Sequence, residues 1–151
     1  MTLGTAVHCL TLEPQAFDAR YVVAPAQCEA VKKDGKKCAN APLRRIGGQW
    51  VCGVHGKGTG GPGDDNRITL DDTTYNTVRA IRDAVMANEW AGQIVANATD
   101  RELAIEWTEQ DVRCKALFDL LLSKHGIVAD LKTTADASPE AFQRSLDSFG
   151  Y

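Results

Sequence analysis

"GIVADLKTT", residues 126–134, places an acid and a base inside a short run that is otherwise rich in strand-forming residues. Side chains alternate between the two faces of a strand, so Asp130 and Lys132 are expected to point the same way. A plain buried strand would carry apolar side chains at both positions. The stretch therefore predicts a β-strand with a chemical role.

A second acid precedes this strand. "KALFDLLL", residues 115–122, carries Asp119 in an otherwise apolar segment, and a hairpin through residues 124–126 would bring Asp119 beside Asp130. Two unpaired carboxylates would repel each other and be costly to bury, whereas Mg²⁺ binds such oxygen ligands. Lys132 would then orient or activate a water molecule. Taken alone, the Asp-x-Lys spacing is equally typical of an ordinary ion pair at a strand edge.

Length and composition limit the function classes. With 151 residues, 44% hydrophobic and 25% charged, the chain is expected to form one globular domain with a modest core. The apolar runs are shorter than the roughly 20 residues of a membrane span, and no signal-peptide pattern opens the chain. We expect no membrane association and a cytoplasmic location. The net charge of −3 argues against a generally basic nucleic-acid-binding surface.

The cysteines favour a metal site over disulfides, because their number, five, is odd. Three thiolates and one imidazole form a complete tetrahedral set for structural Zn²⁺. The predicted zinc ligands are Cys28, Cys38, Cys52 and His55. Turns at residues 34–35 and 47–48 would bring them together. We expect a zinc-binding β-hairpin module at residues 28–55, similar to small zinc-ribbon modules of phage and bacterial proteins, followed by a glycine-rich linker at residues 56–66; three unrelated buried cysteines are the alternative.

The zinc segment is locally basic. Between residues 28 and 55 there are six basic and two acidic residues, and zinc with three thiolates would add one negative charge. The segment stays positive enough to contact phosphates. The candidate DNA-contacting lysines are Lys32, Lys33, Lys36 and Lys37. A role in keeping the hairpin soluble explains them equally well.

The rest of the chain alternates between helical and strand patterns. A helix is expected within residues 1–24, followed by a strand-like "RYVVAP", and a second helix at about residues 74–95 is capped by Asp71 or Asp72. Strands are expected within residues 102–122 and 126–134, with turns at "TEQD" and "SKHG". A last helix begins at Pro139 after a Ser138 cap. The pattern predicts an α+β fold with a small, mostly antiparallel sheet flanked by helices.

Four motifs in order resemble the RecE-type exonuclease family (exonuclease VIII), a branch of the PD-(D/E)xK nucleases. They are "GTAVHCLTLEP", "REL", "CKALFDLL" and "IVADLKTTADASPEAFQRSLDSFGY", and they cover the chain outside the zinc segment. The resemblance implies a restriction-endonuclease-like core. It also implies a Mg²⁺- or Mn²⁺-dependent exonuclease acting on double-stranded DNA ends in phage-type recombination, with a RecT-like annealing protein as partner and a homo-oligomer as an assembly to consider.

The resemblance also assigns roles to residues. Asp119, Asp130 and His8 are implied as magnesium ligands and Lys132 as the catalytic lysine. Glu102 matches the acid of the family's "E-L-S" strand, as an outer partner of the metal or water, with Glu106 as a competing choice. Lys115 and Thr133 lie at positions where contacts with substrate phosphates are expected.

The chain departs from the family pattern in two ways. Where relatives show "K-A-R-P-D", it has "KALFD" at residues 115–119, so a basic side chain beside the metal site is missing. The family also continues past "GY" into a helix with DNA-contacting residues and has an earlier helical segment before His8. We therefore expect the chain to be truncated at both ends.

Two further functions compete with the nuclease hypothesis. A catalytically inert zinc-containing DNA-binding or protein-interaction module would explain the truncation, although an idle site has no physical reason to keep Asp119, Asp130 and Lys132 together. A metal-dependent enzyme for a small phosphate substrate is disfavoured, because no glycine-rich phosphate loop opens a helix.

Overall fold

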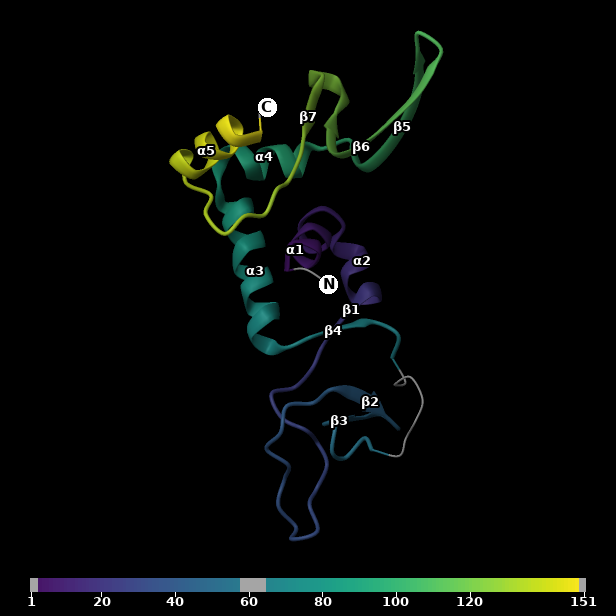
Figure 1. Cartoon of the computed structure of the whole chain (residues 1–151), viewed down its shortest axis with the longest axis vertical. Helices are drawn as coiled ribbons and strands as arrows, with labels where there is room; N and C mark the ends of the chain where they lie inside the picture. The colour runs from purple at the N-terminus through teal and green to yellow at the C-terminus, as the bar shows by residue number, and fades with distance from the viewer. Residues whose placement is uncertain (1–2, 58–64, 150–151) are drawn as a thin grey trace.

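The computed structural model describes residues 3–57 and 65–149 and has the α+β architecture expected from the sequence (Figure 1). The helices are α1 (Leu3–Leu12), α2 (Pro14–Arg20), α3 (Asp72–Ala87), α4 (Glu89–Asn97), the 3₁₀ turn η1 (Ser123–His125) and α5 (Pro139–Phe149). The strands are β1 (Tyr21–Val23), β2 (Arg44–Ile46), β3 (Gln49–Val51), β4 (Ile68–Leu70), β5 (Asp100–Glu109), β6 (Val112–Leu122) and β7 (Ile127–Ala129).

The main sheet is an antiparallel meander in the order β5-β6-β7, as the sequence predicted. Gln110 and Asp111 have φ values of 49° and 65°, and Glu109 pairs with Val112 across them. This two-residue turn with both residues left-handed matches the right-handed twist of the strands. It fixes the register of the long β5–β6 hairpin and hence which side chains face each other.

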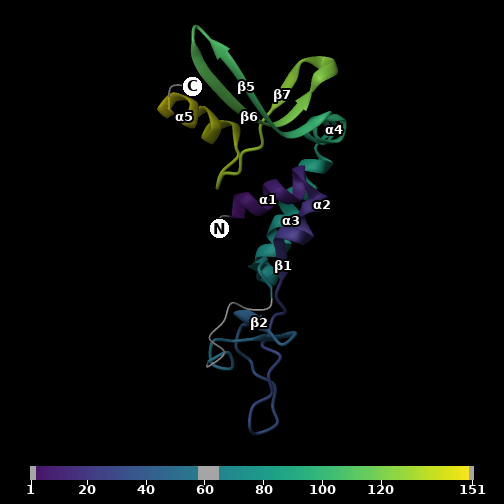
Figure 2. The ribbon, with the colours of Figure 1, turned by 90° about the vertical axis from the view of Figure 1, so that its right-hand side faces the viewer.

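A helical layer lies beside this sheet (Figures 1 and 2). Helix α1 packs on α2 and α3 around a buried apolar cluster. The cluster contains Ala6, Val7, Cys9, Phe17, Tyr21, Leu70 and Val78. Leu12, at the end of α1, belongs to a second cluster with Val95 and Leu120, so it joins α1 to α4 and β6. This packing holds α1 against the sheet.

The zinc segment leaves the helical layer between two strands that pair with each other. β1 and β4 form a parallel pair in which Tyr21 aligns with Ile68 and Val23 with Leu70. The segment between them contains the antiparallel β2–β3 hairpin and lies at one end of an elongated molecule, with the β5–β7 sheet at the other (Figure 1). Gly47 and Gly48, with φ values of 57° and 82°, form the predicted turn between β2 and β3. Part of the predicted linker, residues 58–64, lies outside the described residues.

Helix termini follow the predicted caps, but the helices are shorter than expected. The Asp71 carboxylate accepts a hydrogen bond from the Thr74 N–H at 2.8 Å, and the Ser138 hydroxyl accepts one from the Ala141 N–H at 3.2 Å. The single helix predicted at residues 74–95 is wrong, because Asn88 ends α3 and caps α4. The break moves Trp90 out of the core stripe and leaves it 79% exposed.

The strand predicted at residues 126–134 is also shorter than expected. β7 stops at Ala129, and residues 130–137 form no regular element before α5. Gly126, with φ of 61°, ends the "SKHG" turn in the left-handed conformation that favours glycine. Asp130 and Lys132 thus lie on a connecting segment that follows the sheet.

Among the described helices, none has the length and apolar character needed to cross a bilayer.

Candidate functional site

The β5–β6 register places two carboxylates opposite each other. Arg101 pairs with Leu120 and Leu103 with Phe118, so Glu102 and Asp119 occupy the opposing positions between these two pairs. Glu102 has a φ of 50°, an uncommon conformation for a residue with a side chain. Backbone strain of this kind occurs where the surrounding structure imposes it, often at functional sites. It interrupts the ladder at the point where the two acids meet.

His8 on α1 contacts both acids. Its Nε2 atom lies 2.8 Å from Asp119 Oδ2, and its Nδ1 atom lies 3.1 Å from Glu102 Oε1. Asp119 is buried, while the side chains of His8 and Glu102 are 29% and 26% exposed. The site therefore joins a helix to two neighbouring strands and stays open to solvent on one side.

These three side chains fit a divalent cation. One ligand atom from each of His8, Glu102 and Asp119 lies within 4.8 Å of the others. Glu102 Oε1 is buried, and within the described chain no hydrogen-bond donor is aligned on it. Carboxylate oxygens suit Mg²⁺ or Mn²⁺, and an imidazole is an acceptable additional ligand for Mn²⁺. A cation would satisfy the buried oxygen and offset the two negative charges.

Electrostatics at the site agree with this donor set. Burial raises the pKa of Glu102 above its ordinary value of 4.5, and the neighbouring Asp119 raises it further, while His8 acts in the opposite direction. A carboxylate that is costly to ionise in the empty site gains most from a nearby positive charge. The site is therefore electrostatically incomplete without a cation.

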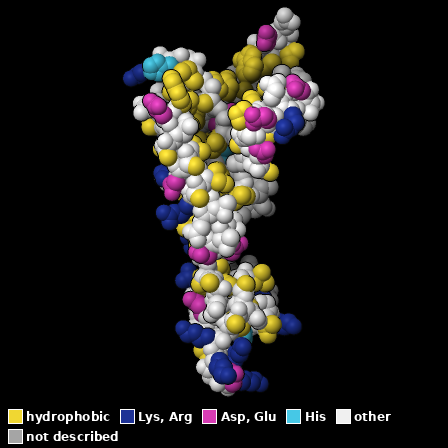
Figure 3. Space-filling view, turned by 90° about the vertical axis from the view of Figure 1, so that its left-hand side faces the viewer, with side chains coloured by type: hydrophobic (Ala, Val, Ile, Leu, Met, Phe, Trp, Pro, Cys, Tyr) yellow, Lys and Arg dark blue, Asp and Glu magenta, His cyan; other side chains and the backbone are white. Residues whose placement is uncertain are grey.

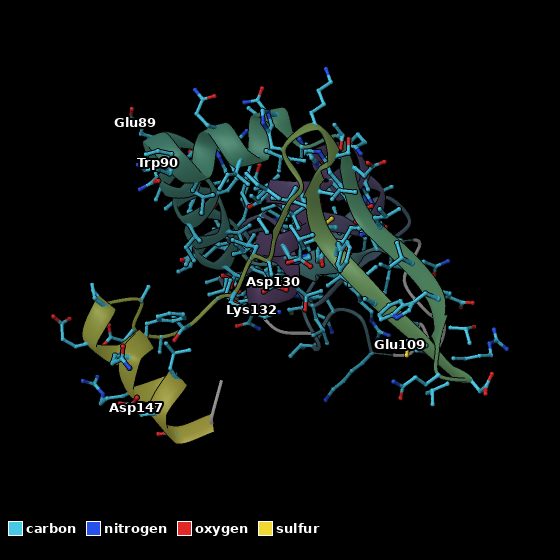
Figure 4. All side chains as sticks on the ribbon, turned by 90° about the horizontal axis from the view of Figure 1, so that it is seen from above. Glu89, Trp90, Glu109, Asp130, Lys132 and Asp147 are labelled. Atoms are coloured by element: carbon cyan, nitrogen blue, oxygen red, sulfur yellow. The ribbon has the colours of Figure 1, made fainter. Side chains whose placement is uncertain are left out.

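Asp130 and Lys132 lie beside this cluster (Figure 4). The Leu131 N–H donates to Asp119 Oδ2 at 2.7 Å, which anchors the segment that carries them. Because Leu120 pairs with Ala129, the continued register places Asp130 next to Asp119. Lys132 Nζ lies 2.8 Å from Asp130 Oδ1, so the two share one side, as predicted.

The compact ligand group differs from the predicted magnesium set of Asp119, Asp130 and His8. In the described residues Glu102 completes that group, while Asp130 lies outside it and forms the ion pair with Lys132. Both side chains are exposed, Lys132 by 81% and Asp130 by 48%. The competing choice, Glu106, is exposed on the hairpin and lies 3.3 Å from Arg113. The two-residue turn at Gln110 contained the signal that selects Glu102, because it sets the register.

A cavity of about 470 Å³ opens next to the cluster, with His8 and Glu102 in its wall. Two arginines also line it, but both are engaged by acids. Arg20 forms hydrogen bonds with Glu13 at 2.7 and 3.2 Å, and Arg67 lies 2.6 Å from Asp65. The cavity is therefore polar but not strongly basic.

The second candidate metal centre lies in the inserted segment. Cys28, Cys38, Cys52 and His55 come together with ligand atoms within 4.8 Å of one another. Cys38 Sγ lies 3.9 Å from Cys52 Sγ, and His55 Nδ1 lies 3.5 Å from Cys28 Sγ and 3.4 Å from Cys52 Sγ. Zn–S bonds of about 2.3 Å and Zn–N bonds of about 2.0 Å in a tetrahedron require separations of about 3.8 Å and 3.6 Å. The cluster could therefore bind zinc with little rearrangement.

Neighbouring groups favour the thiolate form of this site. The Cys52 N–H donates to Cys28 Sγ at 3.3 Å, and the Asn40 amide donates to Cys52 Sγ at 3.6 Å. The backbone N–H of His55 is the main cause that lowers the pKa of Cys52 to about 6. Hydrogen bonds from the surrounding shell orient ligands and tune a metal site. The four protein ligands leave no open position, which is typical of a structural zinc site.

The predicted DNA-contacting residues are distributed over the molecule. Lys115 is exposed on β6 and pairs with Glu106 in the ladder. Thr133 lies close to α1, where a Cβ atom added at Gly4 would collide with its hydroxyl oxygen. The four module lysines are exposed at the opposite end of the molecule from His8 (Figure 1). The structure thus does not gather them into one patch.

Comparison with known proteins gives one family. No curated protein and no solved structure matches the chain significantly. The family described as "PDDEXK-like domain of unknown function (DUF3799)" matches residues 1–151, which is the whole chain. That superfamily has a nuclease-type fold, in agreement with the α+β architecture and the acidic cluster. The chain therefore belongs to this family of PDDEXK-like domains.

Proposed function

We propose that this chain is a metal-dependent deoxyribonuclease whose active site is built by His8, Glu102 and Asp119, together with Asp130 and Lys132. The observation that carries the proposal is the meeting of one imidazole and two carboxylates within 4.8 Å, with a buried Glu102 oxygen that lacks an aligned donor. The match to a PDDEXK-like family supports the same reaction class.

Each residue has a role that follows from its position. Asp119 and Glu102, with His8, would hold Mg²⁺ or Mn²⁺. The bound cation supplies Lewis acidity toward a phosphodiester. Asp130 holds Lys132 through the 2.8 Å ion pair, and the exposed ammonium can reach a substrate phosphate or its attacking water.

The finer function rests on the resemblance of the four sequence motifs. We propose that the substrate is a double-stranded DNA end, that the reaction is exonucleolytic and cytoplasmic, and that a RecT-like annealing protein receives the product strand. The exposed side of the cluster supports a large substrate, because His8 and Glu102 are both partly accessible. A homo-oligomer would be compatible with such a role.

The test is digestion of end-labelled linear DNA, with and without Mg²⁺, by this chain and by a version extended at both ends. Asp119→Asn should abolish cleavage, because a neutral amide cannot balance the cation. Asp147→Asn, an exposed change on α5, is the matched control (Figure 4). Cleavage by Asp119→Asn at the wild-type rate would refute the proposed active site.

A second candidate function is an inert DNA-binding or interaction module. Its supporting observation is the position of Asp130, which pairs with Lys132 instead of joining the compact ligand group. This candidate predicts DNA binding without Mg²⁺-dependent cleavage in both the chain and its extended version. The digestion experiment separates the two functions.

A further inference from the structure

The zinc segment contains a small hairpin whose two ends are the first two predicted zinc ligands. The Cys28 N–H donates to the Asn40 carbonyl at 2.9 Å, and the Cys38 N–H donates to the Ala30 carbonyl at 3.0 Å. Val31 and Lys37 form an antiparallel bridge between them. The hairpin base therefore lies at the metal-ligand cluster.

The tip of this hairpin has a defined turn. The Lys32 N–H donates to the Lys36 carbonyl at 2.8 Å, and the Gly35 N–H donates to the Lys32 carbonyl at 3.0 Å. The Asp34 carboxylate accepts from the Lys36 N–H at 3.0 Å, and Gly35 has a φ of 80°. These contacts hold the turn, but none of them fixes its direction relative to the rest of the chain. That direction depends on the base.

Little besides the ligands holds the base. The buried cluster of the segment consists of Cys28, Cys38, Cys52 and Val51, with Ala30 and Ile46 packed against it. Three of its four buried members are thiols. A segment with so small an apolar core needs a metal ion to fold stably. A cation bound by the Cys₃His cluster would therefore order the hairpin.

The tip presents a concentrated positive charge. Lys32, Lys33, Lys36 and Lys37 are all exposed, and the described part of the chain offers none of them an ion-pair partner. Asp34 is the single acid among them, in a chain whose net charge is −3. Basic side chains gather at this end of the molecule (Figure 3). Phosphate groups of a nucleic-acid backbone complement such a tip, because they attract lysine without requiring base-specific geometry.

We propose that the Cys₃His cluster binds a structural zinc ion and that this ion positions Lys32, Lys33, Lys36 and Lys37 to hold the backbone of double-stranded DNA. The identity of the partner rests on the proposed nuclease function, whereas the zinc site stands on its own geometry. The contact lies at the opposite end of the molecule from His8 and Asp119 (Figure 1). It therefore adds affinity for DNA without taking part in phosphodiester cleavage.

The first test is DNA binding by the full chain without Mg²⁺, measured by fluorescence anisotropy over a range of salt. Replacing the four lysines by glutamine should weaken binding at least about tenfold at low salt and lower the salt slope by about 3 to 4, as expected for four lost phosphate contacts. The matched control removes four charges elsewhere, at Arg79, Arg82, Lys124 and Arg144. Equal losses in both variants, or no loss in the lysine variant, would overturn the proposal.

The second test examines the coupling between zinc and the lysines. Wild-type protein should contain one zinc per chain, and Cys38→Ser should lose it, while Cys114→Ser, outside the cluster, should keep it. Cys38→Ser should weaken DNA binding in the wild-type background and have no additional effect in the four-lysine variant. An equal effect in both backgrounds would contradict a zinc-positioned tip.

A second measurement covers loss of folding in Cys38→Ser. If its helical circular dichroism falls, chelator-treated wild-type protein is compared before and after zinc is restored, and recovery of the full salt slope is expected. Absence of recovery counts against the proposal. Because every readout is binding or metal content, a chain that binds DNA but never cleaves it would refute the nuclease function and leave this inference intact.

Discussion

Glu102 and Asp119 face each other across the β5–β6 hairpin, and His8 contacts both. Like charges in opposing positions of an antiparallel pair are destabilising. The imidazole offsets this repulsion in part, yet one buried Glu102 oxygen has no aligned donor within the described residues. The arrangement favours a bound cation over an empty site, and this leads to a prediction about pH.

Metal-free wild-type protein should lose stability relative to Glu102→Gln as pH rises from about 4.5. The folded pKa of Glu102 is raised above 4.5, mainly by burial. The folded chain therefore holds this proton more tightly than the unfolded chain, and the favourable contribution is complete below the unfolded pKa and lost as pH rises through the folded pKa. Urea unfolding at several pH values measures the difference.

Mg²⁺ should reverse that loss for the wild type and have less effect on Glu102→Gln, because binding to the native state stabilises it. Glu109→Gln, at the exposed hairpin tip, shows the effect of removing a carboxylate away from the site (Figure 4). Parallel stability curves for wild type and Glu102→Gln across this pH range would show that Glu102 is not an ionisable member of the site.

Lys132→Ala should slow DNA cleavage by about 10²-fold or more while leaving Mg²⁺ affinity nearly unchanged, the order expected when one positioned electrostatic or acid-base group is lost. Its ammonium is 81% exposed and contacts Asp130, so its removal leaves the compact ligand group in place. Lys124→Ala on η1 is the matched exposed control. A large loss of metal binding in Lys132→Ala would assign it a structural role instead.

Zinc removal should unfold the inserted segment locally and leave the helical layer folded. The segment's buried cluster around Cys28 and Cys52 shares no residue with the cluster around Phe17 and Val78. Hydrogen exchange should therefore accelerate for amides of residues 28–55 after chelation, with little change in α1 and α3. Global unfolding at the same chelator concentration would mean that zinc stabilises the whole chain.

Gly92→Ala should destabilise the chain by about 1–3 kcal/mol, the range for overpacking a well-filled site. A Cβ atom at Gly92 would collide with the backbone carbonyl of Met86, at the junction of α3 and α4. Gly53→Ala is the control, since its added Cβ would meet only Leu43 at 3.9 Å. Chemical unfolding of the two variants gives the comparison, and equal stabilities would mean that the helix junction adjusts freely.

Local chemistry allowed much of the fold to be predicted. The Asp71 and Ser138 caps, the Gly47–Gly48 turn and the antiparallel meander are all set by short-range patterns. The early end of β7 and the helix break at Asn88 could not be read from hydrophobic periodicity. Asn88 caps α4 through hydrogen bonds to the N–H groups of residues 90 and 91, a local interaction that competes with a continuous helix.

The candidate site was predictable only in part. Asp119 and His8 come together as the motif resemblance implied, but the place of Glu102 beside them depends on strand register and on its left-handed backbone. Register follows from the turn at Gln110, which sequence reasoning located without extending the pairing down the hairpin. The relation of Asp130 to the ligand group depends on where β7 ends, a tertiary feature.

Asp130→Asn should abolish cleavage in an active form of the protein and weaken Mg²⁺ binding, because the continued register puts its carboxylate next to Asp119. In the cation-free arrangement this carboxylate lies 2.8 Å from Lys132, and metal binding would compete with that ion pair. Calorimetric Mg²⁺ titration of Asp130→Asn, Glu102→Gln and the Asp147→Asn control ranks the carboxylates directly. Unchanged Mg²⁺ affinity with lost cleavage would restrict Asp130 to positioning Lys132, and Glu102 would then be the second acidic ligand beside Asp119.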